Sequence, residues 1–248
     1  MQNPDGTCDE VSHSWKVDAL DSSYAALLVD LDNDRDQDLV VSTDETLLVF
    51  SNTGKEGFQI EYRLPVGRSA RSICAADFDQ DGDLDIFLCK FESVRKRDDL
   101  IVMPVDLGRA NDGGRNVLLR NDEGFQFADA TEEAGITSNN SYFTRSAVWS
   151  DYDQDGDQDL YVVNEFATDQ IYENQNGWFR EVTGAVGVRE VARHRTVSCG
   201  DFNHDGRSDF YVATDVPFSV QRSFGRVERG TESRDFRDAV TGLSLIHI

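Results

Sequence analysis

Short apolar runs alternate with short acidic loops along most of the chain. The first run of each pair ends at a loop (A-A-L-L-V, S-I-C-A-A, S-A-V-W-S and T-V-S-C-G), and the second begins at or after the last Asp (L-V-V, I-F-L, L-Y-V-V and F-Y-V-A). These runs are three to five residues long, β-branched and aromatic, and bounded by Gly, Asn and Asp, which is typical of β-strands. Both faces of the second run are apolar, as expected for a sheet covered on both sides.

Two further strands are predicted in each unit. The third is an apolar arm before a repeated Asn, found at Asn52, Asn121 and Asn174. The fourth carries a Gly-aromatic pair and, in two units, the segments F-A-D-A-T-E-E-A-G-I and F-R-E-V-T-G-A-V-G-V. The pattern therefore predicts four short strands per unit.

The four acidic loops repeat at a nearly constant spacing. We name them loop one (30–38), loop two (77–85), loop three (151–159) and loop four (201–209), and their starts are 47, 74 and 50 residues apart. The long interval contains an apparent insertion at 90–115, and removing its 26 residues leaves 48. Four strands every 47–50 residues predict an all-β fold, a β-propeller built of four-stranded blades that bury each other's faces.

The repeats divide the chain into three parts. We expect a disordered or linker N-terminus at 1–13, propeller repeats over 14–243, and a non-repeat tail at 244–248. Residues 14–20 are interpreted as the last strand of a preceding blade, so the chain is expected to be a fragment of a larger propeller. The alternative is a four-blade piece with a foreign tail. The insertion is locally basic. It is either a solvated loop with Leu100–Met103 tucked onto the blade, or a partner-binding loop, since repeat proteins place insertions on the binding face.

Each loop has the composition of a calcium site. Loops two and three begin with D-x-D-x-D-G, loop four has Asn at the third position, and loop one has Arg35 in place of the Gly. In this template the side chains at positions 1, 3 and 5 and the carbonyl of position 7 supply oxygens, and hard cations such as Ca²⁺ prefer oxygen. An EF-hand also needs Glu at position 12, but that position is Val or Leu in all four copies. We therefore expect the Asp at position 9 to close the cage within a β-hairpin.

The predicted metal-binding residues follow from this template, with residues at position 7 acting through their carbonyls. They are Asp30, Asp32, Asp34, Asp36 and Asp38 in loop one; Asp77, Asp79, Asp81, Asp83 and Asp85 in loop two; Asp151, Asp153, Asp155, Asp157 and Asp159 in loop three; and Asp201, Asn203, Asp205, Arg207 and Asp209 in loop four. Loops two to four are the three principal sites. Loop one is compromised if its turn needs a positive φ, which costs Arg35 steric strain and brings a cation to the rim. Asp and Asn are also good turn residues without a metal, which is the structural alternative.

Charge and composition narrow the class of partner. The formal net charge is −23 and the loops hold 18 of the 47 acidic residues, so nucleic acid and anionic membrane surfaces are excluded as partners. A hydrophobic content of 39% argues against disorder. The four cysteines are too few for a disulfide framework. Cys74 and Cys89 flank loop two and are either bridged across the hairpin or packed as free thiols. No signal peptide or transmembrane segment is visible.

The motif D-x-[DN]-x-D-G-x-x-D between hydrophobic strands resembles the FG-GAP/VCBS repeat family, the calcium-loop propellers of integrin α-subunit heads and many secreted bacterial proteins. The N-x-x-x-G-F and F-x-[DE]-[AV]-T-x-x-x-G-[IV] elements are most similar to the cartilage acidic protein-like branch. The resemblance covers about residues 14–243 and departs at Arg35. It implies an extracellular propeller with calcium between the first two strands of a blade, often used in adhesion or matrix contact.

No catalytic motif is present in the sequence. There is no G-x-S-x-G elbow, P-loop or H-E-x-x-H, and the four histidines form no ligand spacing. We expect a non-enzymatic module in which calcium is structural and the partner is an extracellular protein or glycan. The alternative is a calcium-dependent polysaccharide lyase or hydrolase, or a lectin, on a propeller scaffold.

Overall fold

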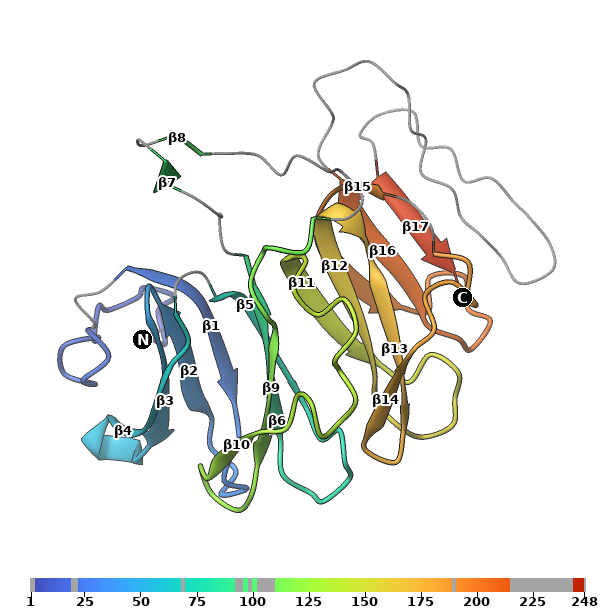
Figure 1. Ribbon diagram of the computed structural model, residues 1–248. Helices are drawn as coiled ribbons and strands as arrows, with labels where there is room; N and C mark the ends of the chain where they lie inside the picture. The colour runs from blue at the N-terminus through green and yellow to red at the C-terminus, as the bar shows by residue number, and fades with distance from the viewer. Residues whose placement is uncertain are drawn as a thin grey trace.

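The protein is an all-β molecule made of consecutive antiparallel sheets (Figure 1). The computed structural model describes residues 3–18, 22–67, 70–91, 96–97, 100–101, 110–188, 191–214 and 243–247. Two four-stranded sheets and one seven-stranded sheet follow one another along the chain. Each four-stranded sheet is one blade and the seven-stranded sheet contains two, so each of these blades, numbered one to four, holds the two strands that flank one acidic loop. The blades confirm the predicted propeller architecture.

The blades share one strand order. Blade one contains β1 (Ser23–Val29), β2 (Asp38–Thr43), β3 (Thr46–Asn52) and β4 (Phe58–Pro65), with a 3₁₀ turn η1 (Gly54–Glu56) before β4. Blade two contains β5 (Ala70–Ala76), β6 (Asp85–Lys90), β9 (Val117–Asn121) and β10 (Phe127–Asp129). Blade three contains β11 (Phe143–Ser150), β12 (Asp159–Thr168), β13 (Gln170–Gln175) and β14 (Trp178–Glu181). Blade four contains β15 (Val191–Gly200), β16 (Asp209–Thr214) and β17 (Leu243–His247).

The first strand of each blade faces the first strand of the next. β1 lies against β5, β5 against β11, and β11 against β15, so these four are the inner strands of the fan in Figure 1. Blades three and four are also joined by backbone pairing, since Glu165 of β12 pairs with Arg193 of β15 and Thr168 pairs with Val191. The predicted insertion leaves blade two after β6, and its hairpin of β7 (Lys96–Arg97) and β8 (Leu100–Ile101) lies apart from the blade.

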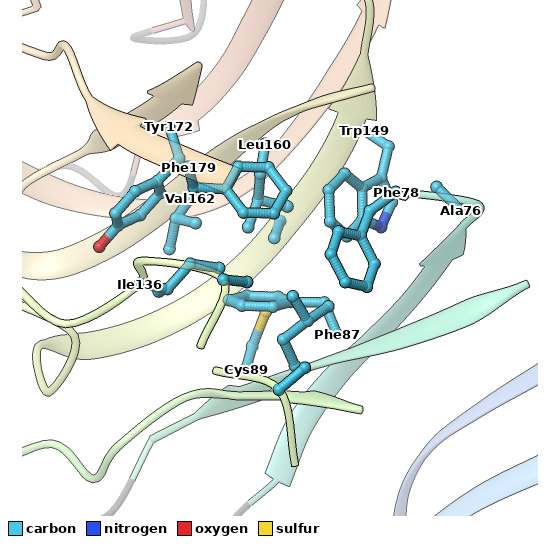
Figure 2. Packing of buried hydrophobic residues seen from close by; sticks show 14 residues of the cluster. Ala76, Phe78, Phe87, Cys89, Ile136, Trp149, Leu160, Val162, Tyr172 and Phe179 are labelled. Carbon is cyan, nitrogen blue, oxygen red and sulfur yellow. The ribbon is translucent and has the colours of Figure 1, made fainter. Parts of the chain in front are cut away.

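The hydrophobic core lies between blades, which is why the second strands are apolar on both faces. Figure 2 shows the cluster between blades two and three, where Phe87 meets Trp149 edge-on at 6.2 Å between ring centroids and Phe78 lies 5.8 Å from Phe179. Between blades three and four, Tyr161 packs on Phe210 at 4.8 Å. The residue at position 2 points into this layer in loops one to three, where Leu31, Phe78 and Tyr152 are buried, whereas Phe202 of loop four is 54% exposed. Loops one to three are therefore each anchored to the next blade by their own second residue.

The structure also tests sequence expectations about the cysteines and about the two ends of the chain. The four cysteines are free, so the bridge between Cys74 and Cys89 is not formed, and Cys89 is buried in the core. Their strands pair Cys74 with Phe87 and Cys89 with Ser72, so the two cysteines are not opposite each other. Residues 12–16 form a turn rather than the predicted strand. The segment predicted as a non-repeat tail includes most of β17, which occupies the third-strand position of blade four.

The role proposed for Leu100–Met103 lies outside the described residues or rests on side chains that are not described. Among the residues that the structure covers, no helix has the length and apolar character needed to cross a membrane.

Candidate metal centre

Each acidic loop is a tight hairpin turn with two left-handed positions. Position 4 has a positive φ in all four loops, at Asn33, Gln80, Gln154 and His204. Position 6 also has a positive φ, from +85° to +99° at Gly82, Gly156 and Gly206, and +79° at Arg35. The sequence prediction that this turn needs a positive φ is correct. Arg35 nevertheless adopts the same backbone conformation as the three glycines.

The turn brings three carboxylates together in each of the first three loops. One oxygen from each of positions 1, 3 and 9 lies within 4.8 Å of the other two. The groups are Asp30, Asp32 and Asp38; Asp77, Asp79 and Asp85; and Asp151, Asp153 and Asp159. Loop one therefore assembles the same group as loops two and three despite Arg35. Loop four has Asn203 at position 3, so it supplies two of the three carboxylates.

The Asp at position 9 is the most deeply buried carboxylate of each group. Asp85 is fully buried, and its Oδ2 accepts the backbone N–H of Phe78 at 3.0 Å while its Oδ1 accepts that of Asn121 at 2.9 Å. Asp38 and Asp159 make the same two contacts with their own loop and third strand. Burial raises the pKa of Asp85 to about 7, against the lowering effect of these hydrogen bonds and with a further rise from Asp79 and Asp81.

The same shift occurs in the neighbouring loops, where burial raises the pKa of Asp38 to about 6 and that of Asp159 to about 7. These groups sit in a setting that disfavours their charged form. A cation at the centre of the group would reverse that preference.

Other carboxylate oxygens point inward without a partner. Asp30 Oδ1, Asp79 Oδ1 and Asp151 Oδ1 are buried and, among the described residues, have no hydrogen-bond donor. The second oxygen of Asp30 and of Asp151 accepts the backbone N–H of position 6, at 3.0 and 3.2 Å. Unpaired buried acceptors are costly, and each of these three also lies beside other carboxylates of its own loop, which repel it. This donor set, all oxygen and strongly negative, fits a hard divalent cation such as Ca²⁺.

Positions 5 and 7 differ from the simple template. The Asp at position 5 turns one oxygen to the backbone N–H of position 7, as in Asp81 to Asp83 at 2.9 Å, and it lies outside the three converging groups. Loops one, three and four repeat this contact. The ligand roles of positions 5 and 7 therefore stay predictions, and positions 1, 3 and 9 form the geometric centre.

The side chain at position 4 links successive loops, a role that the sequence did not reveal. Gln80 Nε2 of loop two donates to the Gly156 carbonyl at 2.9 Å and to Asp157 Oδ1 at 2.7 Å in loop three. Asn33 makes the same pair of bonds to Gly82 and Asp83, and Gln154 bonds to the Gly206 carbonyl. The recurrence of an amide at position 4 was visible in the sequence, but its partner lies on another blade.

The repeated Asn also ties loops to blades. Asn174 Nδ2 donates to the Phe78 carbonyl of loop two at 2.8 Å and to the Gln158 carbonyl of its own loop at 3.1 Å. Asn121 makes the equivalent bonds to Leu31 at 2.9 Å and Leu84 at 3.4 Å. Loops one and two are thus each held by their own blade and by the next, so the geometry of their carboxylate groups is coupled to the blade interface.

Two solved structures are similar to part of this chain. No curated protein sequence matches it. Among solved structures, the V. cholerae biofilm matrix protein Bap1 is similar with a TM-score of 0.45 and 14% identity, over 79% of this chain and 24% of that one. An Agrocybe aegerita lectin, whose structure concerns specific recognition of non-reducing terminal N-acetylglucosamine, is similar with a TM-score of 0.43 and 17% identity, over 79% and 47% of the two chains.

The family comparison agrees with the loop positions. The FG-GAP-like repeat matches residues 30–88 and 151–212, and each matched segment starts at the first Asp of a loop and contains two loops. The match does not separate the integrin-like from the cartilage acidic protein-like branch, so that finer resemblance stays a prediction. The chain therefore carries two segments that match the FG-GAP-like repeat, which supports the predicted resemblance to the FG-GAP/VCBS repeat family.

Proposed function

We propose that the protein is a calcium-binding extracellular β-propeller module that binds another protein or a glycan, with calcium in a structural role. One observation carries the calcium part of the proposal. Three loops each gather three carboxylate oxygens within 4.8 Å, and three of these loop carboxylates have a buried oxygen without a donor among the described residues. Bound calcium would supply the positive charge that this arrangement lacks.

The contacts around position 9 explain how the metal would act on stability. Asp85 joins the start of loop two, through Phe78 N–H, to the end of the third strand, through Asn121 N–H. A cation held by Asp77, Asp79 and Asp85 would fix the turn between β5 and β6 and keep Asp85 ionised in this bonded position. Because Gln80 links loop two to loop three, fixing one loop also supports the next.

The family resemblance and the charge support an extracellular setting and a binding role. Calcium sites of extracellular modules have dissociation constants of roughly 10⁻⁴–10⁻³ M, which suits millimolar calcium outside cells. We propose a non-enzymatic role, because the sequence has no catalytic motif and the clustered carboxylates serve a metal site. A net charge of −23 favours a protein or glycan partner over nucleic acid.

The calcium role is tested by replacing one carboxylate with the residue that loop four has naturally. Asp79→Asn converts position 3 of loop two to the Asn203 pattern, so the turn is retained while one negative oxygen is lost. Asp112→Asn is the matched control, because Asp112 is exposed and outside the loops. Calorimetric calcium titration is expected to lose or weaken one site in Asp79→Asn only, and the calcium-dependent rise in melting temperature should shrink. An unchanged melting temperature of the native chain in EDTA and in calcium would refute the proposal.

A further inference from the structure

Each inner strand contains a β-bulge at the same repeat position, six residues before the first Asp of its loop. The register between inner and second strand shifts at this point in all four blades. The bulged residues are Tyr24, Arg71, Arg145 and Arg195. A bulge re-aims a side chain, and bulges are over-represented beside functional sites. Three successive inner strands therefore use the same backbone device to direct an arginine.

These arginines gather around one buried carboxylate. Glu165 of β12 is 1% exposed at its side chain and accepts Arg145 Nε at 2.6 Å, Arg193 Nε at 3.0 Å and Arg195 Nη1 at 3.1 Å. Burial lowers the pKa of Arg145 against the opposing effect of Glu165, and the charges of Arg195 and Arg71 lower it further. Three guanidinium groups, those of Arg145, Arg193 and Arg195, thus bind one carboxylate, and Arg71 is grouped with them as a fourth arginine because its charge acts on Arg145. We call them the arginine cluster.

Aromatic rings hold the arginines in place. The Arg71 guanidinium lies 4.1 Å from the centre of the Tyr24 ring, and that of Arg145 lies 3.6 Å from the centre of the Phe91 ring, at the base of the insertion. Stacking on a ring fixes the plane of a guanidinium and leaves its N–H edge free to meet an acceptor. Arg71 Nε is buried and has no hydrogen-bond acceptor within the described residues. The cluster therefore has donor capacity that the described fold does not use.

Backbone strain marks the same place. Phe166 follows Glu165 and has φ of +71°, an outlier for a bulky aromatic residue, and it is 6% exposed. It lies under Arg193 at 5.5 Å and packs edge-on against Phe143. Strained conformations persist where the surroundings fix them, and they concentrate at binding sites. The strain sets the position of Glu165, and through it the positions of three arginines.

We propose that the arginine cluster is a binding site for the carboxylate groups of an acidic saccharide. The inference deepens the proposed function, because it names a ligand class for the same module and rests on that function for its extracellular setting. Guanidinium forks match carboxylates in a bidentate geometry. The arginines come from three successive blades, so the site suits a ligand with repeated carboxylates better than a single anion.

A hollow at the same end of blade three favours a saccharide over an acidic peptide. Its volume is about 420 Å³, and its lining combines hydroxyl and amide groups with the two carboxylates of Asp169 and Glu181. The hydroxyl and amide groups belong to Tyr142, Thr168, Gln170, Thr183 and Asn139. Thr168 ends the strand that carries Glu165, and Asp169, also in the lining, lies 2.8 Å from His194, the residue between Arg193 and Arg195. Sugar hydroxyls pair with such groups, whereas an acidic peptide has no comparable set of hydroxyls.

The test uses a hyaluronan tetrasaccharide as the carboxylate probe and its carboxyl-reduced form as the neutral counterpart. Binding to the chain in calcium buffer is measured by calorimetry for the native protein, Arg71→Gln, Arg71→Lys and Arg63→Gln. Arg71 stacks on Tyr24 and has no contact with Glu165 among those described, so its loss leaves the buried ion pairs intact. Arg63 is an exposed arginine on the outer strand of blade one and controls for the loss of charge.

We expect the acidic tetrasaccharide to bind, the reduced form not to bind, and Arg71→Gln to weaken binding about tenfold, since a hydrogen bond to a charged group contributes about one decade or more of affinity. Arg71→Lys should recover binding only in part, and Arg63→Gln should match the native protein. Equal binding by native protein and Arg71→Gln, absence of binding by the native protein, or tighter binding of polyglutamate than of the tetrasaccharide would each overturn the assignment.

One more variant distinguishes saccharide binding through calcium from saccharide binding through the arginine cluster. Asp79→Asn should keep its affinity for the tetrasaccharide, and a loss in Asp79→Asn with Arg71→Gln intact would refute the arginine site. The calcium-dependent rise in melting temperature should persist in Arg71→Gln. If that rise is absent from the native protein while the tetrasaccharide still binds through Arg71, the calcium proposal fails and the arginine site stands.

Discussion

Position 6 of the turn allows the cost of a side chain at positive φ to be measured, because it is Arg35 in loop one and glycine in the other three loops. Arg35 has φ of +79°, in the region where a Cβ costs about 1–2 kcal/mol. Its backbone N–H bonds to Asp30 Oδ2 at 3.0 Å, and Gly82 N–H makes the equivalent bond to Asp77 at 3.1 Å. A Cβ added at Gly82 would meet nothing within 4 Å. The penalty at this position is therefore local backbone strain, without a clash.

The magnitude follows from two opposing effects. Arg35→Gly stabilises the folded state by removing about 1–2 kcal/mol of strain. The greater freedom of glycine in the unfolded chain lowers the stability by about 0.4–1 kcal/mol. The variant should be more stable by about 1 kcal/mol, which is about 2–4 °C in melting temperature for a chain of this length. Gly82→Arg should lose a similar amount in loop two. Chemical unfolding in saturating calcium measures both.

Charge is controlled separately, because Arg35→Gly also removes a cation from an acidic loop. Arg35→Gln removes the same charge and keeps the Cβ at φ of +79°. The difference in unfolding free energy between Arg35→Gly and Arg35→Gln then excludes the charge and reports the strain less the effect of glycine on the unfolded chain. If the two variants are equally stable, the steric interpretation of the turn is wrong.

Two further predictions concern the loops. Gln80→Glu should lose about 1–2 kcal/mol of stability in calcium, because it replaces two donated hydrogen bonds with a carboxylate facing Asp157. His204→Gln, at the exposed equivalent position in loop four, should leave the unfolding free energy unchanged in the same assay. Equal effects of the two variants would contradict a stabilising role for the hydrogen bonds between loops two and three. In EDTA, the contribution of Asp38, Asp85 and Asp159 to stability should fall as pH rises from about 4 to 7. Their folded pKa values lie at about 6 to 7, above the unfolded value near 3.8, so the folded state binds more protons than the unfolded state in this pH range. In calcium these groups must be ionised, so the melting temperature difference between calcium and EDTA should widen from pH 5 to pH 8, and a constant difference would count against the assignment of these three carboxylates.

The repeat pattern predicted the parts of the structure that depend on side-chain alternation within one unit. The inner and second strands, the hairpin at each loop and the closing role of position 9 all follow from residues that are neighbours along the chain. Position 5 was assigned by analogy with the calcium-loop template. The structure shows that one oxygen of Asp81 accepts the backbone N–H of Asp83, because a tight hairpin has its own donors to satisfy, and the ligand role of Asp81 stays a prediction.

Features that depend on a second blade were not predictable in the same way. The amide of Gln80 finds its acceptors in loop three, and the bulge at Arg145 exists only in the register between β11 and β12. A signal for the bulge was present in the sequence, because Arg71, Arg145 and Arg195 each lie six residues before the first Asp of a loop. Those arginines precede the apolar runs that identified the strands. The inner strands extend into them, with β5 starting at Ala70 and β11 at Phe143.

The same six-residue offset sets the distance between the two kinds of charge. A strand rises about 3.3 Å per residue, so the arginine cluster and the loop carboxylates lie about 20 Å apart at opposite ends of the inner strands. The Debye length is about 8 Å at physiological ionic strength, so the acidity of the loops does not cancel the potential around the arginines. Calcium binding should then change affinity at the arginine cluster only through folding of the blades. Tetrasaccharide affinity that follows calcium concentration well below the melting temperature would show that the two ends are coupled directly, contrary to this separation.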